Sequence, residues 1–176
     1  MDSRYLICPL CHAPLKAEKN SLFCDGERRH CYDIASSGYV NLLPPGKKSN
    51  AKTGDDTQML KSRRTFLSSG HYDNISQSAA CAAFEFLKGR ERIVFADAGC
   101  GDGYHAMNIE AFFNKKGLHS TPIGLEASKG GAQIAAKLEK QKNSNATFIC
   151  ANIFDMPLAD KCCDCVFSMF APVPDS

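Results

Sequence analysis

The chain has 176 residues, of which 44% are hydrophobic and 23% charged, and its formal net charge is +2. This composition excludes a disordered or low-complexity chain, and no apolar run approaches the roughly 20 residues that a membrane helix needs. No apolar stretch typical of a secretory signal peptide follows the first residues, so we expect a cytoplasmic protein without a membrane partner. The oligomeric state stays open, and a homodimer is one option.

Ten cysteines are many for a protein expected in a reducing compartment. Disulfides are rare there, so metal ligation is the first alternative. The charge is uneven as well, because residues 1–65 hold 11 Lys and Arg against 7 Asp and Glu, whereas residues 66–176 hold 10 against 12. A basic front half indicates either a polyanionic partner or an ordinary solvated surface.

Residues 1–43 are predicted to form a small domain with too few large apolar side chains for a core of its own. Cys8 and Cys11 make a Cys-x2-Cys knuckle, Cys24 follows after 12 residues, and His30 follows after five more. Three thiolates and one imidazole are typical of a closed structural zinc site. We therefore predict a structural Zn²⁺ held by these four residues, with Cys31 as the rival of His30. Its binding would supply folding energy that the small domain lacks.

Residues 44–72 are predicted to be a linker followed by a basic helix. Turn-forming residues dominate positions 44–56. Asp56 can cap the helix, whose apolar stripe consists of Met59, Leu60, Phe66 and Leu67 beside Arg63. A second helix is predicted over residues 74–88, with five side chains facing inward, namely Ile75, Ala79, Ala82, Phe86 and Leu87.

Short apolar runs alternate with helical periodicity in residues 73–176. Strands are predicted over residues 92–97, 122–126, 146–150 and 163–170, and helices over residues 104–115 and 129–141. This alternation predicts βαβ units, a parallel sheet and an α/β fold of the Rossmann-like kind.

A glycine-rich loop, Asp97-Ala98-Gly99-Cys100-Gly101-Asp102-Gly103, follows the first of these strands and opens a helix. A dinucleotide site requires G-x-G-x-x-G, whereas this loop has G-x-G-x-G with an aspartate two residues earlier. That pattern is typical of class I S-adenosylmethionine-dependent methyltransferases. The cofactor carries a sulfonium, and Asp97 and Asp102 provide the carboxylates that such a cation favours. Nucleotides bind at this end of a doubly wound sheet.

Two further positions complete the predicted cofactor site. Glu126 ends the second strand and can accept the ribose hydroxyls, or it is an exposed charge at a strand end. Asn152 follows the third strand, near where the adenine ring usually lies, or it is a simple turn residue.

Several stretches together resemble the bacterial 23S ribosomal RNA guanine-N1-methyltransferases of the RlmA type. They are Cys8-Pro9-Leu10-Cys11, Gly38-Tyr39-Val40-Asn41-Leu42-Leu43-Pro44, Arg63-Arg64-Thr65-Phe66-Leu67 with Gly70-His71-Tyr72, the glycine loop, Gly124-Leu125-Glu126 and Phe170-Ala171-Pro172. The resemblance implies an RNA-recognising zinc domain and a cofactor contact from Tyr72. It implies transfer of a methyl group from S-adenosylmethionine to N1 of a guanine in a hairpin loop of large-subunit ribosomal RNA. The residues that catalyse the transfer stay unassigned.

The chain departs from this family at its end, since family members continue past the fourth strand and carry a later histidine at the cofactor site. A catalytic domain incomplete at its carboxyl terminus is therefore expected. Two alternatives stay open: a non-catalytic chain that binds zinc or RNA, and a methyltransferase that acts on a small molecule.

Overall fold

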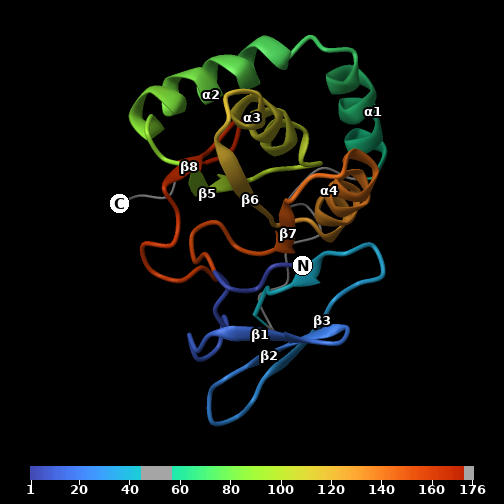
Figure 1. Cartoon of the computed structure of the whole chain (residues 1–176). Helices are drawn as coiled ribbons and strands as arrows, with labels where there is room; N and C mark the ends of the chain where they lie inside the picture. The colour runs from blue at the N-terminus through green and yellow to red at the C-terminus, as the bar shows by residue number, and fades with distance from the viewer. Residues whose placement is uncertain (45–56, 173–176) are drawn as a thin grey trace.

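The protein contains a small antiparallel sheet and a larger parallel sheet, as seen in a computed structural model that describes residues 1–44 and 57–172 (Figure 1). The small sheet has the order β1-β2-β3 and is built from β1 (Leu15–Glu18), β2 (Ser21–Cys24) and β3 (Cys31–Asp33). It lies within residues 1–43, which we call the amino-terminal module.

The larger sheet has the order β4-β7-β6-β5-β8, and all of its pairs are parallel. Its strands are β4 (Val40–Asn41), β5 (Arg92–Ala98), β6 (His119–Glu126), β7 (Thr147–Cys150) and β8 (Cys165–Phe167). The helices are α1 (Thr57–Ser68), α2 (Asp73–Leu87), α3 (Tyr104–Lys115) and α4 (Lys129–Lys142). The predicted α/β fold with a parallel sheet is confirmed. Ser128 caps α4, because its hydroxyl accepts the Gly131 N–H at 3.1 Å.

The two faces of the larger sheet have different covers. Ile93 and Phe95 of β5 pack with Phe148 of β7 into a core completed by α2, α3 and α4. The alternate residues Val94 and Ala96 instead share a core with the amino-terminal module, including Leu6, Leu15 and Leu22 of that module. A strand that is buried on both faces reads as a continuous apolar run, which explains the sequence Ile-Val-Phe-Ala in β5.

Backbone hydrogen bonds fasten the amino-terminal module to the larger sheet. Strand β4 pairs with β7, the Ile7 N–H donates to the Pro157 carbonyl at 3.0 Å, and the Ala159 N–H donates to the Tyr5 carbonyl at 2.9 Å. The module is therefore attached to the larger sheet both at its β4 edge and on one of its faces.

Two local predictions were wrong. Helix α2 buries Leu87 as predicted, but it also buries Ser76 and Ala80, whereas Ile75 and Ala82 are exposed and Phe86 is 89% exposed. Apolar residues occur on every side of this helix, so its periodicity does not single out one face. Strand β8 ends at Phe167 and not at residue 170. There the Ser168 hydroxyl donates to the Ala171 carbonyl at 3.3 Å and the chain turns.

Helix α1 buries Leu60 and Leu67 but leaves Met59 and Phe66 half exposed, so its predicted apolar stripe is only partly covered. Its predicted cap, Asp56, lies outside the described residues. Among the described helices, none combines the length and apolar character needed to cross a membrane.

Candidate metal and cofactor sites

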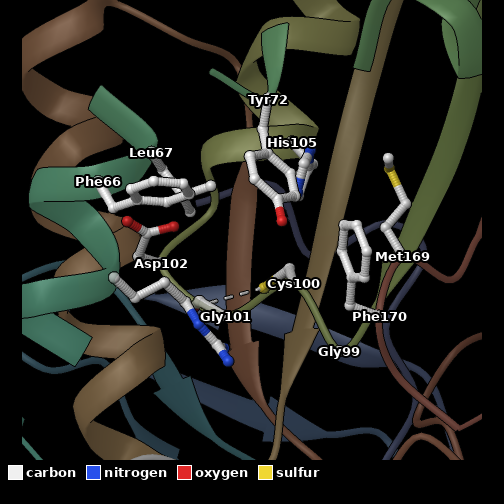
Figure 2. A pocket seen from close by; sticks show the side chains of 11 residues that line it. Phe66, Leu67, Tyr72, Gly99, Cys100, Gly101, Asp102, His105, Met169 and Phe170 are labelled. Carbon is white, nitrogen blue, oxygen red and sulfur yellow. Dashed lines mark hydrogen bonds between the residues drawn. The ribbon is translucent and has the colours of Figure 1, made fainter. Parts of the chain in front are cut away.

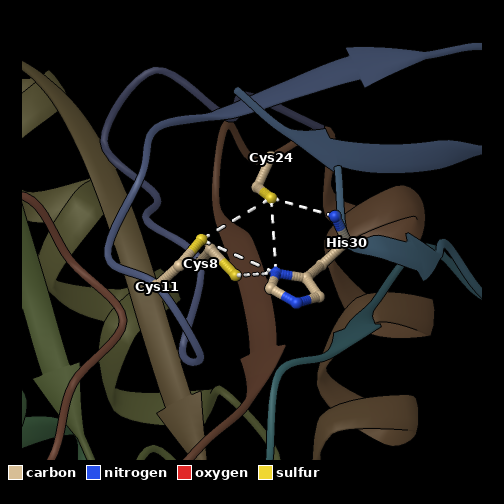
Figure 3. Close-up of side chains that lie close together, drawn as sticks. All are labelled: Cys8, Cys11, Cys24 and His30. Carbon is tan, nitrogen blue, oxygen red and sulfur yellow. Dashed lines mark hydrogen bonds between the residues drawn. The ribbon is translucent and has the colours of Figure 1, made fainter. Parts of the chain in front are cut away.

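The predicted metal ligands Cys8, Cys11, Cys24 and His30 lie together beside the small sheet (Figure 3). Their ligand atoms are all within 4.8 Å of one another. Cys8 and Cys11 come from the knuckle before β1, Cys24 ends β2, and His30 precedes β3. The turn between β2 and β3 returns His30 to Cys24, whose sulfur accepts the His30 backbone N–H at 3.0 Å.

The spacing of these atoms fits a tetrahedral zinc ion. Zn–S bonds of about 2.3 Å and Zn–N bonds of about 2.0 Å place tetrahedral ligands about 3.8 Å apart for two sulfurs and about 3.5 Å apart for sulfur and nitrogen. The Cys11 and Cys24 sulfurs are 3.7 Å apart, and Nδ1 of His30 lies 3.4, 3.6 and 3.5 Å from the sulfurs of Cys8, Cys11 and Cys24. Cys31, the predicted rival of His30, is exposed on β3 and is not part of this group.

The surroundings of Cys8 favour the thiolate that a zinc ligand must provide. Burial raises the pKa of the Cys8 thiol, but hydrogen bonds from the Tyr32 hydroxyl and from the backbone amides of Leu10 and Cys11 outweigh burial and lower this pKa to about 6. The Tyr32 oxygen lies 3.0 Å from the Cys8 sulfur. Tyr32 therefore stabilises the charged form of Cys8 from outside the ligand set.

The glycine-rich loop leaves β5 and curves over the carboxyl ends of β5 and β6. Gly101 has a φ of +57°, and a Cβ added at this position would meet no atom within 4 Å. Gly103 has a φ of +78°, and a Cβ there would meet the Phe148 ring at 2.7 Å. Gly103 is thus required for packing, whereas Gly101 leaves an open approach to the backbone for a ligand.

Asp97 is a buried carboxylate whose two oxygens make no hydrogen bond among the described residues. It is 1% exposed, and burial raises its pKa to about 7, with the backbone N–H of Ala106 opposing this rise and the charge of Glu126 adding to it. Because a buried polar group without a partner is costly, it is expected to serve a ligand. A cationic ligand would provide the missing partner.

Glu126 connects the glycine-rich loop with the turn that begins α4. Its two carboxylate oxygens accept the N–H groups of Gly101 and Ser128 at 3.0 and 2.7 Å. Asp102 lies on the same loop, and its carboxylate accepts the Tyr104 N–H at 3.2 Å. Burial raises the pKa of Asp102, while Arg64 and Arg63 oppose this rise. These carboxylates give the site a negative character with cations at its margin.

A cavity of about 240 Å³ opens above the loop (Figure 2). The residues that line it come from α1, the following turn, the loop, α3 and the segment after β8: Arg63, Phe66, Leu67, Tyr72, Gly99, Cys100, Gly101, Asp102, His105, Met169 and Phe170. Four residues of the predicted cofactor site are among them, namely Tyr72, Gly99, Gly101 and Asp102. Asp97, Gly103 and Glu126 lie immediately beside this lining along the chain or through hydrogen bonds.

Asn152 is not part of that lining. Its side-chain oxygen accepts the Phe154 N–H at 3.1 Å, which is the geometry of a turn residue. It nevertheless follows β7 at the same edge of the sheet, where the Ala151 N–H donates to the Glu126 carbonyl at 3.0 Å.

Sequence reasoning did not assign His105, Met169 or Phe170 to the site. His105 is 9% exposed, its Nδ1 lies 2.8 Å from the Ser76 hydroxyl, and burial lowers its pKa. His105 follows the last glycine of the loop by only two residues. Its position on the first turn of α3, next to the loop, could therefore have indicated that it lies at the cofactor site. Arg63 and Phe66 lay within the Arg-Arg-x-Phe-Leu run but had received no role at the cofactor.

Comparisons with known proteins match both parts of the chain. A family model described as "RlmA, N-terminal", a zinc ribbon, matches residues 6–51, and a methyltransferase-domain model matches residues 95–175. A solved structure from Methanococcus maripaludis, described as an S-adenosyl-L-methionine-dependent methyltransferase, is 20% identical with a TM-score of 0.55 and covers 65% of this chain and 50% of its own. At this identity the likeness shows the fold.

Two relatives match almost the whole chain. The 23S rRNA (guanine(748)-N(1))-methyltransferase of Streptomyces fradiae is 33% identical over 96% of this chain and 56% of its own length. YxjB of Bacillus subtilis, described as a 23S rRNA (guanine-N(1)-)-methyltransferase, is 29% identical over 98% of this chain and 58% of its own length. The chain thus spans a little over half the length of these relatives. It is a homologue of the RlmA-type 23S rRNA guanine-N1-methyltransferases, with an RlmA-type zinc ribbon and a class I methyltransferase domain.

Proposed function

We propose that this chain takes part in the transfer of a methyl group from S-adenosylmethionine to N1 of a guanine in large-subunit ribosomal RNA. The observation that carries the proposal is the match to guanine-N1-methyltransferases over 96% and 98% of the chain. The geometry supports it, because the glycine-rich loop lines a cavity and follows the buried Asp97 carboxylate, whose oxygens make no hydrogen bond among the described residues.

The cofactor site would be formed by the glycine-rich loop and the carboxylates around it. S-adenosylmethionine, when bound, supplies a methyl group already activated by its sulfonium. Asp97 and Asp102 would favour the cationic end of the molecule, Glu126 would accept its ribose hydroxyls, and Tyr72 would contact it from the turn after α1. In such a site the protein mainly orients the reactants and excludes water.

The zinc ion would be held by Cys8, Cys11, Cys24 and His30 and would have a structural role. Four protein ligands close its coordination shell and leave no position for a reacting water. The amino-terminal module would then contact RNA, and Arg63 and Arg64 of α1 would add phosphate contacts. Lys47, Lys48 and Lys52 of the basic stretch before α1 would provide further phosphate contacts; they lie outside the described residues.

The division of the chain into residues 1–43, 44–72 and 73–176 remains part of this proposal. It is supported by the gap between the family matches at residues 6–51 and 95–175. Strand β4 falls within the first part but pairs with β7 of the third, so the parts need not fold independently.

Tritium transfer from labelled S-adenosylmethionine tests the proposal. Purified large-subunit ribosomal RNA from cells that lack the enzyme is compared with small-molecule extracts, and nuclease digestion locates the label. We expect 1-methylguanosine in the RNA, and D97A is expected to abolish its formation. If the label is found only in a small molecule, the proposal that RNA is the substrate fails.

The electrostatic part is tested separately by reversing the charge of Lys47 and Lys48. The double variant is expected to bind RNA more weakly and with a smaller salt dependence. An unchanged salt slope would remove these lysines from the RNA-binding surface.

A further inference from the structure

Phe170 has an unusual position for a large apolar residue. It lines the cavity, yet its side chain is 73% exposed. Its φ of +60° lies in the left-handed region, which bulky residues rarely adopt. Strained residues of this kind persist only where their surroundings hold them, and they are concentrated at ligand sites.

The surroundings of Phe170 do hold it. The Ser168 hydroxyl donates to the Ala171 carbonyl at 3.3 Å, across the turn that contains Phe170. Ala171 packs so closely on the glycine-rich loop that a Cβ added at Gly99 would lie 2.4 Å from the Ala171 Cβ. The exposed Phe170 ring therefore lies on a turn that packs against the glycine-rich loop.

Aromatic rings surround one side of Phe170 (Figure 2). Its ring centroid lies 5.6 Å from that of Tyr72 and 5.9 Å from that of His105. Phe66, which is 51% exposed, lies 5.6 Å from Tyr72 on the other side. The mouth of the cavity thus has a partly exposed aromatic rim made of Phe66, Tyr72 and Phe170.

The order of the strands indicates which ligand meets this rim. The carboxylates assigned to the cofactor end β5 and β6, whereas Phe170 follows β8, on the opposite side of β5. A second ligand that approaches along the β8 side would meet Phe170 before it reaches the loop. Unpaired nucleobases are commonly held by stacking on aromatic side chains.

We infer that Phe170 is the residue on which the target nucleobase stacks, with Phe66 bordering the same subsite. This inference rests on the proposed RNA methyltransferase function and specifies how its acceptor base is held. A nucleobase that leaves the base stack loses the neighbouring bases on both of its faces. The exposed face of the Phe170 ring would take the place of one of these neighbouring bases.

A fluorescent reporter tests the contact directly, because the chain contains no tryptophan. In F170W the indole occupies the inferred subsite, whereas in F86W it lies on α2, where Phe86 is 89% exposed. Both variants are titrated with a ribosomal RNA hairpin that carries loop guanosines, in the presence of S-adenosylhomocysteine. We expect stacking to quench F170W and to leave F86W unchanged.

Two further substitutions separate binding from folding. F170A is expected to lower kcat/KM for RNA by about 5-fold to 140-fold, the range for the loss of one base–aromatic stack. F170G should lower it similarly but keep or raise the thermal midpoint, because glycine adopts a positive φ without strain. Both variants should retain the wild-type affinity for S-adenosylhomocysteine, measured by calorimetry.

The outcomes distinguish this inference from the proposed function. If F170A stays folded but loses affinity for S-adenosylhomocysteine, Phe170 belongs to the cofactor site and the inference fails. If wild type methylates RNA while F170W is not quenched, the inference fails and the function stands. If RNA quenches F170W but receives no methyl group, the function fails and the stacking contact stands.

Discussion

Asp97 is the residue whose environment most directly constrains ligand binding. Without a ligand, its burial raises its pKa to about 7, so the folded state binds a proton more readily than the unfolded state between about pH 4 and pH 7. Asp97 therefore lowers stability progressively as the pH rises through this window. A bound cation reverses the preference, since it favours the ionised carboxylate.

The affinity for S-adenosylmethionine should consequently rise with pH up to about 7, approaching a tenfold gain per pH unit well below the pKa. D97N should bind the cofactor more weakly, with a smaller dependence on pH, and should be more stable than wild type at neutral pH without ligand. Calorimetry from pH 5.5 to 8 and thermal melts check both expectations. If the affinity of D97N for the cofactor depends on pH as steeply as that of wild type, a group other than Asp97 causes the pH dependence.

Tyr32 is the residue outside the ligand set that is expected to influence metal binding most. Y32F removes the hydroxyl 3.0 Å from the Cys8 sulfur and should weaken zinc binding by about 10-fold to 100-fold, as is usual for a partner outside the ligand set. Competition with a chromophoric chelator measures the affinity. Y5F is a matched control, because Tyr5 belongs to the same module but contacts Arg4. Equal affinities in both variants would contradict a role for the hydroxyl.

At the scale of elements, β8 positions Phe170, the rim residue that follows it. This strand has only three residues, and the Asp164 carboxylate just before it accepts the Val94 N–H of β5 at 2.8 Å and pairs with Arg90. The attachment of β8 to β5 thus depends on one side chain in addition to the backbone ladder.

D164A should loosen this attachment. A hydrogen bond to a charged group contributes about 1.5–3 kcal/mol, and we expect a loss of stability in this range. We also expect faster amide exchange in β8 than in β6, because β6 is paired on both sides. Hydrogen exchange with mass spectrometry gives the comparison, and E85A on the exposed surface of α2 is the control. Uniform exchange across both strands would contradict a separate role for Asp164.

The elements that could be predicted from the sequence are those with one dominant signal. Helix α3 matches its predicted bounds of 104–115, since a glycine turn precedes it and its apolar residues recur at helical spacing. Strand β4 gave no signal, because two residues cannot show alternation. The inward face of α2 was mispredicted because its apolar residues occur on every side, and only packing against α3 selects Ser76 and Ala80.

The residues of the candidate sites likewise differ in how clearly the sequence indicates them. Cys8, Cys11, Cys24 and His30 are marked by residue type and spacing, and the structure brings their ligand atoms together. The Asp97 and glycine-loop positions are marked in the same way. Phe170 is marked only as part of the Phe170-Ala171-Pro172 stretch, which does not indicate its role. That role depends on a positive φ and on neighbours that lie about 65 to 100 positions earlier in the chain.

At the scale of the whole molecule, the amino-terminal module serves as the cover of one sheet face. Leu6, Leu15 and Leu22 share a core with Val94 and Ile123. Loss of the metal should therefore affect the methyltransferase domain as well as the module, because a wide apolar surface of the sheet would lose its cover.

Zinc removal by a chelator, or C24S, should abolish the cooperative unfolding transition at its native midpoint, since structural zinc contributes on the order of 10 kcal/mol of apparent binding free energy in small zinc domains. Amides of β5 and β6 should then exchange faster. C31S is the control, because Cys31 lies outside the ligand group. Unchanged protection of β5 in metal-free protein would show that the two parts unfold separately.

The shared core also sets an order of events during synthesis. The apolar side of the amino-terminal module is complete in sequence at Leu42, but the last strand residue in the shared core is Ile149 of β7, about 107 residues later. At about 5–20 residues per second, a ribosome needs roughly 5 to 20 s to supply that partner. During this interval the nascent module has its four metal ligands but not the sheet. Zinc captured at this stage would hold the module in shape until the strands that cover it emerge.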